Sequence, residues 1–594
     1  MPEHVRTSPV DELAEALDRR VGWHRLPLPL ALLTFFGLRN RLRQRNLFDT
    51  GLADPPASRS WDLRFRKART LDGTFNDVER PLMGSIGTRF GRNVPASEAA
   101  AETAPRIMQP NPRTVSRKLL TRDRFLPATT LNVLAAAWIQ FEVHDWLSHG
   151  RNDFEHPWKV GLADDDDWPQ RPMQIPATQT DPTHLISGGE SLTFLTADSH
   201  WWDASQIYGS VERFAAAVRA GEDGKLRIDE DGLPPTDLEV GLDLSDVPGN
   251  FWIGLGVLHT LFMREHNAIC DRLRHEYPSW SDQRLYDTAR LTNSALMAKI
   301  HTVEWTPAVI AHPTTVYAMH AAWYGLLGKG RARRGPLRNS DLLYGIPGSL
   351  TDHHGVPYSL TEEFVAVYRM HPLLPDEFTF RSAANDQVIG SYTFPEVGAL
   401  NTRRRLQEMS VANAIYSLGV AHPGAITLHN YPRFLQHFDR PDGRLMDLAA
   451  TDILRTRERG VPRYNQFRRL FRLAPARSFD SLSSNPAWAD QIRSVYENKI
   501  EDVDLLIGMY AETPPHGFAF SDTAFRVFML MATRRLKSDR FFTRDYRPEV
   551  YTHAGMDWIN ENTMVSVLLR HYPELAAALS GVANAFTPWN HVAP

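Results

Sequence analysis

Cysteine is almost absent from this sequence: Cys270 is the only one among 594 residues. One thiol cannot form an intrachain disulfide or a multi-cysteine zinc or iron–sulfur site. Concentrated positive charge is absent too, because 66 Lys and Arg are scattered among 70 Asp and Glu, for a formal charge of −4. No basic stripe of the kind that neutralises phosphates is present. We therefore expect no nucleic-acid partner.

Long hydrophobic runs are also missing. The most apolar stretch, residues 26–38 (LPLPLALLTFFGL), is shorter than the roughly 20 residues that span a bilayer, and RNRLRQR follows it directly. The N-terminus is charged and lacks the apolar region of a secretory signal, so we expect a cytoplasmic protein. Two interpretations of 26–38 stay open: a packed helix, or an interfacial helix that contacts a membrane peripherally or guides lipid into a channel.

Helical periodicity dominates what the sequence does contain. Apolar residues recur every three or four positions over 131–149, 252–277, 284–305 and 522–539. Proline, glycine and aspartate gather in 161–184 and in 329–339, which we interpret as long surface loops rather than interdomain linkers. We therefore predict a mainly α protein with an N-terminal helical segment, 1–50, and one large domain, 51–594.

Polar residues interrupt the apolar helix expected over 131–149. Gln140 and His144 stand four apart and share a helix face, beside an alanine run that would let a flat cofactor approach. The alternative is a buried histidine satisfied by a neighbouring helix. Asp145 points about 100° away around the helix, so it cannot simply orient His144 and needs a purpose of its own.

The stretch DSHWWDASQIYGS offers oxygen atoms at alternating positions. They come from Ser199, Asp203 and Ser205, with the Trp201 carbonyl between them. Together with a carboxylate from elsewhere they form a set that Ca²⁺ can use, since it takes six to eight oxygen ligands. Alternatively, these side chains only cap backbone amides in a turn.

Tyr368 and His371 stand three residues apart in FVAVYRMHPLLPD, so on a helix their side chains would be neighbours. Pro372 disfavours the α conformation at His371, which we therefore expect at the end of its helix, with the ring free to enter a cavity. Imidazole is a common ligand of haem iron, and a nearby phenol can be oxidised to a radical. Ordinary core packing is the alternative. His301 and Thr306 are two further polar residues of an apolar helix whose role stays open.

Motifs along nearly the whole chain resemble those of the animal haem peroxidase and cyclooxygenase superfamily. YRMHPLLPD, LFMREHN and IQFEVHDW are similar to superfamily motifs. HTVEWTP, WWDASQIYGS, RLPLPLALL, WYGLLGK and MATRRLKSDRFFT look like the fatty-acid α-dioxygenase branch, known in plants as pathogen-inducible oxygenases. The resemblance implies an all-helical single domain of cyclooxygenase-like fold, with haem between helices.

The resemblance also implies roles for the haem residues. His371 would be the proximal ligand, His144 the distal histidine with Gln140 beside it, and Tyr368 the carrier of a catalytic radical. No Asp or Glu in GNFWIGLGVLHTLF is placed for the ester links that attach haem covalently in some peroxidases. We therefore expect non-covalent haem b.

Two further sites are implied in the same way. Calcium would be held by Asp145, Ser199, Trp201, Asp203 and Ser205; a serine stands at 199 where plant members usually carry threonine. The fatty-acid carboxylate would be held by His301, Thr306 and an arginine of TRRL. We favour Arg534, although helical phase does not exclude Arg535.

The expected activity is α-dioxygenation of a long- or medium-chain fatty acid. With peroxide as activator, a Tyr368 radical would take hydrogen from C2, and O₂ would add to give a 2-hydroperoxy acid. The alternatives are a haem peroxidase that uses hydrogen peroxide, or another cyclooxygenase-like oxygenase; the prostaglandin-forming type carries a cysteine-rich module that a chain with one cysteine lacks. A catalytically inactive haem or lipid carrier of the same fold is the non-enzymatic alternative.

Overall fold

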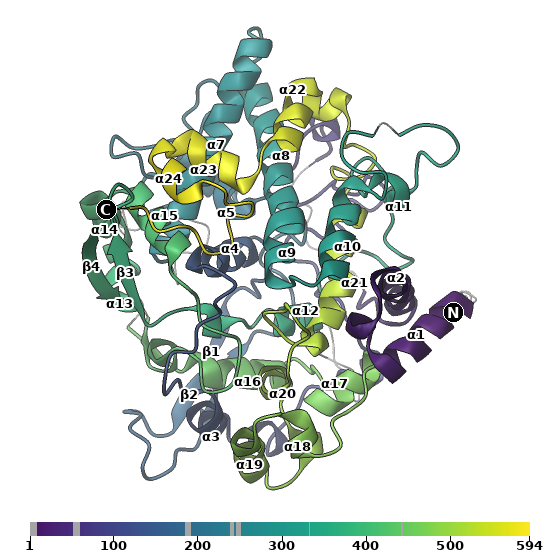
Figure 1. The fold of residues 1–594 in the computed structure, drawn as a ribbon, viewed down its shortest axis with the longest axis vertical. Coiled ribbons are helices and arrows are strands. Elements are labelled where there is room, and N and C mark those ends of the chain that lie inside the picture. The colour runs from purple at the N-terminus through teal and green to yellow at the C-terminus, as the bar shows by residue number, and fades with distance from the viewer. Residues whose placement is uncertain are drawn as a thin grey trace.

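Helices make up most of the regular structure, with three two-stranded antiparallel sheets at the periphery (Figure 1). The computed structural model describes residues 9–51, 60–183, 192–237, 243–244, 251–331, 333–440 and 443–593. The mainly α prediction is confirmed. The helices are α1 (Pro9–Val21), α2 (Leu28–Arg45), α3 (Pro112–Val115), α4 (Val133–Val143), α5 (Ser205–Tyr208), α6 (Glu212–Val218), α7 (Ile253–Glu276), α8 (Asp282–Ile300), α9 (Thr306–Val309), α10 (Pro313–Tyr324), α11 (Asp341–Tyr344), α12 (Glu362–Val367), α13 (Phe394–Val397), α14 (Asn401–Met409), α15 (Val411–Val420), α16 (Leu448–Glu458), α17 (Tyr464–Leu470), α18 (Phe479–Leu482), α19 (Pro486–Val495), α20 (Leu505–Ala511), α21 (Asp522–Ser538), α22 (Pro548–Glu561), α23 (Met564–His571) and α24 (Ala576–Leu579). The strands are β1 (Asn152–Val160), β2 (Met173–Thr178), β3 (Glu377–Arg381), β4 (Val388–Thr393), β5 (Phe438–Asp439) and β6 (Leu445–Met446).

The long helices α7 and α8 pack against each other, with α4 against α7 and α22 against α8 (Figure 1). Their contact faces are apolar, as the periodicity predicts, and aromatic rings fill the space between α4 and α7: the Trp138 and Phe262 centroids lie 5.5 Å apart. Ser281 caps the first turn of α8 by accepting from the Arg284 amide. This core is the rigid frame from which the site residues project.

One buried charge within α7 ties helices together. The Glu265 carboxylate accepts hydrogen bonds from the Arg570 guanidinium at 2.7 Å and from the Trp558 indole at 2.8 Å, and it lies 2.8 Å from His571 Nε2. These partners come from α22 and α23, so the carboxylate joins three helices. A buried charge is tolerated here because it is paired and hydrogen-bonded.

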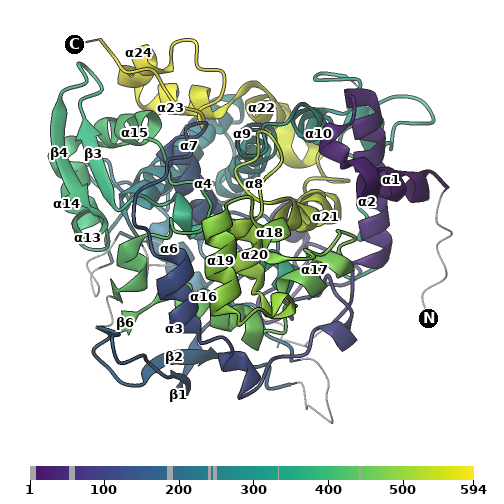
Figure 2. The ribbon, with the colours of Figure 1, turned by 60° about the horizontal axis from the view of Figure 1, so that its bottom comes forward.

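The N-terminal helices α1 and α2 lie at one edge of the molecule, drawn in purple (Figures 1 and 2). The stretch 26–38 is helical as predicted, within α2, and α2 packs against α10 and α21. Trp23, between the two helices, is fully buried and packs against Phe35, Phe518 and Phe525. In the described part of the chain, no helix is long and apolar enough to cross a membrane.

Two local expectations were wrong. The stretch 161–184, interpreted as a loop, contains β2, which pairs with β1 from Trp158↔Ile175 to Val160↔Met173; Met173 and Ile175 alternate with exposed or half-buried neighbours, a short strand pattern hidden among prolines. Tyr368 and His371 also do not share a helix. The helix α12 ends at Val367, and His371 opens a separate 3₁₀ turn, His371–Leu373, so the chain has already left the helix before it reaches the restriction imposed by Pro372.

Candidate active site

A buried cavity brings together residues from six segments of the chain. Its walls come from the chain after α4, the loop before α5, the turn after α8, and the helices α10, α12 and α21 with the residues that follow directly on them. The lining side chains are Trp146, Trp202, His301, Thr302, Thr306, Met319, Phe364, Tyr368, Ala532, Thr533, Arg535 and Leu536. Three of the predicted site residues, Tyr368, His301 and Thr306, are therefore neighbours in space.

Tyr368 follows directly on α12 and is held by aromatic contacts. Its ring packs edge-on against Phe364 and Phe528, each at 4.6 Å between centroids, and against Trp146 at 5.4 Å. Burial raises the pKa of the Tyr368 phenol, since a phenolate would be poorly solvated here. The side chain is therefore a neutral phenol at physiological pH, with its O–H hydrogen in place.

His301 starts a π-helical turn, His301–Trp305, that follows α8. The Trp138 indole donates a hydrogen bond to His301 Nδ1 at 3.2 Å. An indole nitrogen can only donate, so Nδ1 carries no proton and the single ring proton sits on Nε2. Burial, reinforced by the charge of Arg535, lowers the pKa of His301 to about 3 and keeps the ring neutral. Thr306, which ends the turn, donates from its hydroxyl to the His301 carbonyl oxygen at 2.7 Å.

The two candidate arginines of α21 have different surroundings. Arg534, which we favoured, points away from the cavity and donates to the backbone carbonyls of Val356 and Pro357, each at 2.9 Å. Arg535 lines the cavity, with its guanidinium 3.4 Å from the Trp146 ring centroid and 4.7 Å from that of Trp202. The preference for Arg534 does not agree with this geometry: consecutive residues of a helix point about 100° apart, and packing turns Arg535 inward.

Arg535 carries a charge that its protein surroundings do not balance. None of its nitrogens makes a hydrogen bond of good geometry with the described residues, and none of their carboxylates lies within ion-pairing distance. Glu142 accepts instead from the Trp202 indole at 2.8 Å, and burial raises its pKa to about 7. A buried cation in this state favours an anionic ligand.

The two histidines expected around haem lie on separate elements. His144 caps the C-terminal end of α4, and Gln140, one turn earlier, accepts from the Trp252 indole at 2.7 Å. His371 Nδ1 lies 2.9 Å from Asp452 Oδ2. Because Nδ1 faces this carboxylate, Nε2 is the nitrogen left to bind iron, and an adjacent carboxylate raises the basicity of a ligating imidazole. These residues fit a haem ligand set.

Asp452 on α16 was not expected from the sequence. Burial alone would raise its pKa, but Arg369 and His371 outweigh that cost and hold the pKa below its usual range. The Arg369 guanidinium donates to it at 2.5 Å and the Tyr431 hydroxyl at 3.1 Å. Nothing in the sequence around position 452 indicates that Asp452 contacts His371, which lies 81 positions earlier in the chain.

The residues expected to hold calcium gather around the N-terminus of α5. The Ser205 hydroxyl donates to Asp145 Oδ1 at 2.8 Å, and the Ser199 hydroxyl donates to Asp203 Oδ2 at 2.8 Å. Asp145 Oδ2 is buried and has no hydrogen-bond partner among the described residues. Burial and the neighbouring Asp203 raise the pKa of Asp145. Two carboxylates and two hydroxyls thus converge at a point where, among the described residues, only Arg290 pairs with either carboxylate, at 3.7 Å from Asp203.

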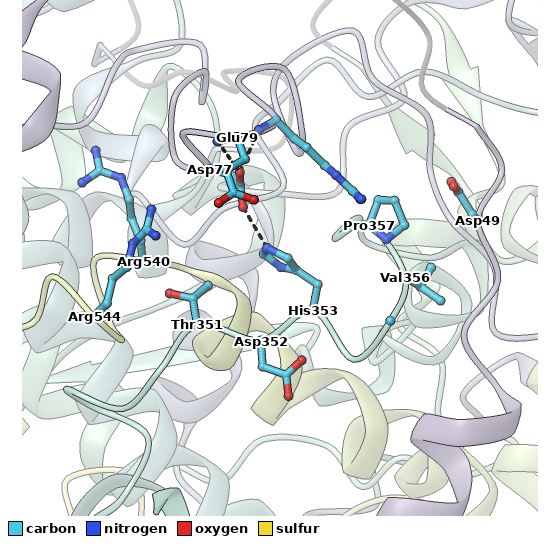
Figure 3. A pocket seen from close by; sticks show the side chains of 12 residues that line it. Asp49, Asp77, Glu79, Thr351, Asp352, His353, Val356, Pro357, Arg540 and Arg544 are labelled. Carbon is cyan, nitrogen blue, oxygen red and sulfur yellow. Dashed lines mark hydrogen bonds and ion pairs between the residues drawn. The ribbon is translucent and has the colours of Figure 1, made fainter. Parts of the chain in front are cut away.

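A larger hollow lies elsewhere, on the surface (Figure 3). It is lined mainly by charged side chains, among them Asp77, Asp352, His353 and Arg540. His353 Nε2 points at Asp77 Oδ2, 2.9 Å away, and Asp352 lies 3.2 Å from His354. Two of its carboxylates, Asp77 and Asp352, have histidine partners, and charged residues predominate in its lining, so it does not suit the apolar chain of a lipid.

Trp146 and Trp202 line the cavity but were not singled out by the residue patterns. Both belong to motifs that were selected because of other residues: Trp146 to IQFEVHDW, selected for His144, and Trp202 to WWDAS, selected for the predicted calcium ligands. The two indole rings stack on each other beside Arg535, with their centroids 5.9 Å apart, and this contact depends on how the two segments fold together. The sequence feature that could have identified these two residues is that each motif has a tryptophan close to its polar residues.

Known proteins share both the sequence and the architecture of this chain. The animal haem peroxidase family matches residues 68–583. The α-dioxygenase PIOX of Oryza sativa subsp. japonica is 38% identical over 595 residues, which covers 97% of this chain and 94% of the relative. A crystal structure of the Oryza sativa fatty acid α-dioxygenase, a variant with palmitic acid, has a TM-score of 0.91 at 36% identity and covers 99% and 98% of the two chains.

A more distant structure shows how far the architecture extends. Peroxidase A from Dictyostelium discoideum has a TM-score of 0.67 at 18% identity, covers 87% of this chain, and supports the fold alone. The predicted fold class and the resemblance seen in the motifs are both confirmed. This chain belongs to the animal haem peroxidase family and, within it, to the α-dioxygenases.

Proposed function

We propose that this protein is a haem-dependent oxidoreductase that converts a fatty acid and O₂ into a 2-hydroperoxy fatty acid. Membership of the family supports haem binding, and the likeness to fatty acid α-dioxygenases supports the substrate class. One observation carries the proposal for this chain. A single buried cavity holds the Tyr368 phenol together with an uncompensated cation, Arg535, and a neutral imidazole, His301.

The cation and the imidazole account for carboxylate binding. Arg535 presents N–H donors, which pair well with the two oxygens of a carboxylate. His301 Nε2–H is a second donor, because the Trp138 indole occupies Nδ1. Thr306 contributes a hydroxyl that now bonds to the His301 carbonyl and can turn towards the ligand. Fixing both oxygens places the α-carbon, one bond away, beside Tyr368.

Tyr368 carries the chemistry on the substrate. His371 would hold haem, with His144 and Gln140 as the other residues expected beside it, and the bound haem would supply the one-electron oxidation of the phenol, with peroxide as the activator. The Tyr368 phenoxyl takes a hydrogen atom from C2, O₂ adds to the carbon radical, and the O–H hydrogen of Tyr368 then completes the hydroperoxide. The tyrosine ends as a radical, ready for another substrate.

Oxygen uptake by the haem-loaded protein, given palmitic acid and trace peroxide, tests the proposal together with mass analysis of the product. We expect a 2-hydroperoxide or the aldehyde one carbon shorter. Tyr368→Phe removes the only O–H at this position while keeping the ring contacts, so we expect it to abolish uptake and leave the haem absorption band unchanged. Oxidation of phenols or halides by peroxide without uptake of O₂ would instead assign the chain as a peroxidase.

Calcium is part of the proposal as a structural ion. Asp145, Ser199, Asp203, Ser205 and the Trp201 carbonyl supply the hard oxygen ligands that Ca²⁺ prefers. The ion would balance the two buried carboxylates and pin the segment after α4 to the loop before α5. Because Asp145 follows His144 directly, this brace would also hold the distal side of the haem.

Three further predictions belong here. Haem b is held without covalent links. The chain divides into an N-terminal segment, 1–50, and a catalytic domain, 51–594. The helices α1 and α2 make a peripheral membrane contact, supported by five apolar side chains that are more than 40% exposed: Val10, Leu13, Val21, Leu28 and Leu33. Co-sedimentation with anionic lipid vesicles tests that contact.

A further inference from the structure

Two arginines on the inner face of α2 make no ion pair with a described residue, although the charge of Asp341 acts on both of them from a greater distance. Arg39 and Arg43 are one helical turn apart, and both Nε atoms are buried without a hydrogen-bond partner among the described residues. Burial lowers the pKa of both groups, most strongly for Arg43, where the charge of Arg39 adds to the effect. Like charges at this spacing repel, so the pair is costly without an anion.

The nearest acids already have partners. Asp341 lies 3.5 Å from Lys537, and Asp352 lies 3.2 Å from His354. By contrast, Arg41 on the same helix is paired: its Nε lies 3.1 Å from Glu15 of α1. Within the described chain, the arginines without an ion pair therefore lie on one face of α2, the face that packs against α10 and α21.

That face adjoins the wall of the active-site cavity. Arg43 Nη2 donates to Thr533 Oγ1 at 3.1 Å, and Thr533 lines the cavity with Tyr368 and Arg535. The two helices under α2 supply cavity residues as well, Met319 from α10 and Thr533 from α21. The Arg43 side chain is also partly exposed to solvent. It therefore stands between solvent and the cavity.

We propose that Arg39 and Arg43 form a first binding station for the fatty-acid carboxylate, at the entrance to the cavity under α2. This inference rests on the proposed function. An incoming carboxylate would neutralise the pair, and Coulomb attraction would raise its association rate. From Arg43 it would pass Thr533 to Arg535, two residues further along α21, where the reaction takes place. The two stations together would draw the substrate in with its carboxylate first.

The test measures binding separately from turnover. In the haem-loaded Tyr368→Phe protein, which is not expected to react, the association rate of palmitic acid is followed by stopped-flow tryptophan fluorescence, since Trp146 and Trp202 line the cavity. We expect Arg39→Gln together with Arg43→Gln to lower the association rate constant about tenfold and to weaken its dependence on salt. Lys in place of Gln at position 43 keeps the positive charge, so Arg43→Lys should recover most of the association rate constant.

Arg45→Gln is the control for loss of an exposed positive charge, because Arg45 is exposed on the same helix; it removes one charge where the double variant removes two. We expect it to bind palmitic acid at the parental rate. The Tm of the Arg39→Gln, Arg43→Gln protein should be equal to or above that of its parent, because an uncompensated charge pair is removed. Equal rates for that protein and the Arg45→Gln control would overturn the inference. Failure of the proposed function has a different signature, namely no oxygen uptake by the unmodified protein with any fatty acid.

Discussion

The Tyr368 cavity and the loop before α5 are both buried and both carry unbalanced charge, but of opposite sign. In the cavity, Arg535 contacts two tryptophan rings and has no carboxylate within ion-pairing distance among the described residues. In the loop, Asp145 and Asp203 lie close together; Asp203 pairs with Arg290 at 3.7 Å, whereas Asp145 has no ion pair with a described residue, so one negative charge is left over. The sign of the excess indicates the ligand: a carboxylate for the cavity and a cation for the loop.

A third buried cluster shows what a balanced site looks like. Glu362, at the start of α12, accepts from His149 Nε2 at 3.0 Å and lies 3.9 Å from Arg459. Although burial raises its pKa, His149 and Arg459 outweigh that effect and hold the pKa at about 2. Here the protein supplies both charges, so the cluster stabilises the structure without a ligand. Burial of charge alone therefore does not identify a binding site; the lack of a counter-charge does.

The largest expected effect separates Arg535 from its neighbour Arg534. Arg535→Gln removes the cation that would bind the substrate carboxylate, and we expect kcat/KM for palmitic acid to fall by roughly two to three orders of magnitude, since deleting one partner of a buried charge pair costs about 2–5 kcal/mol. Steady-state oxygen uptake measures it. The Tm should change little, because no hydrogen bond to the protein is lost.

Arg534→Gln is the matched control for that measurement. It removes the hydrogen bonds to the carbonyls of Val356 and Pro357, so we expect a lower Tm and a much smaller change in kcat/KM. If the two variants exchanged these properties, the assignment of the carboxylate to Arg535 would be wrong, and the original preference for Arg534 would return.

Removal of calcium tests the other half of the comparison. At calcium a hundred times its Kd, the ion would add about 3 kcal/mol to the free energy of unfolding. We therefore expect chelation to lower the Tm and calcium, but not magnesium, to restore it, because magnesium requires a smaller and more rigid octahedral site. Asp145→Asn should abolish this dependence on the ion. A Tm that ignores calcium in the unmodified protein would remove the ion from the proposal.

The smallest expected effect concerns Trp138, which acts on substrate only through His301. In Trp138→Phe the indole N–H that fixes the His301 tautomer is lost, so Nε2 no longer carries the proton at all times. The loss of one hydrogen bond of about 1 kcal/mol predicts a KM about fivefold higher at similar kcat. Trp589→Phe, which loses an indole bond to the Ala585 carbonyl away from the site, should leave KM unchanged.

The sequence predicted the parts of the site that short-range rules control. Gln140 and His144 share one face of α4 because they are four residues apart, and the alternation of Ser199, Asp203 and Ser205 does bring their oxygens together around Asp145. The motifs also identified the family. Local rules failed at the end of α12, which stops at Val367, four residues before His371, the position that Pro372 was expected to restrict.

The sequence by itself determined the helical class of this protein and its family, and it predicted Tyr368, His301 and His371 as site residues, because these inferences depend on periodicity and on motifs within a few residues. Only the tertiary structure decided which of two adjacent arginines faces the cavity, that Asp452 stands behind His371, and that Arg43 reaches Thr533 from α2. The physical reason is that helical phase fixes the angle between neighbours but not the direction of the core. That direction is set by packing between segments hundreds of residues apart.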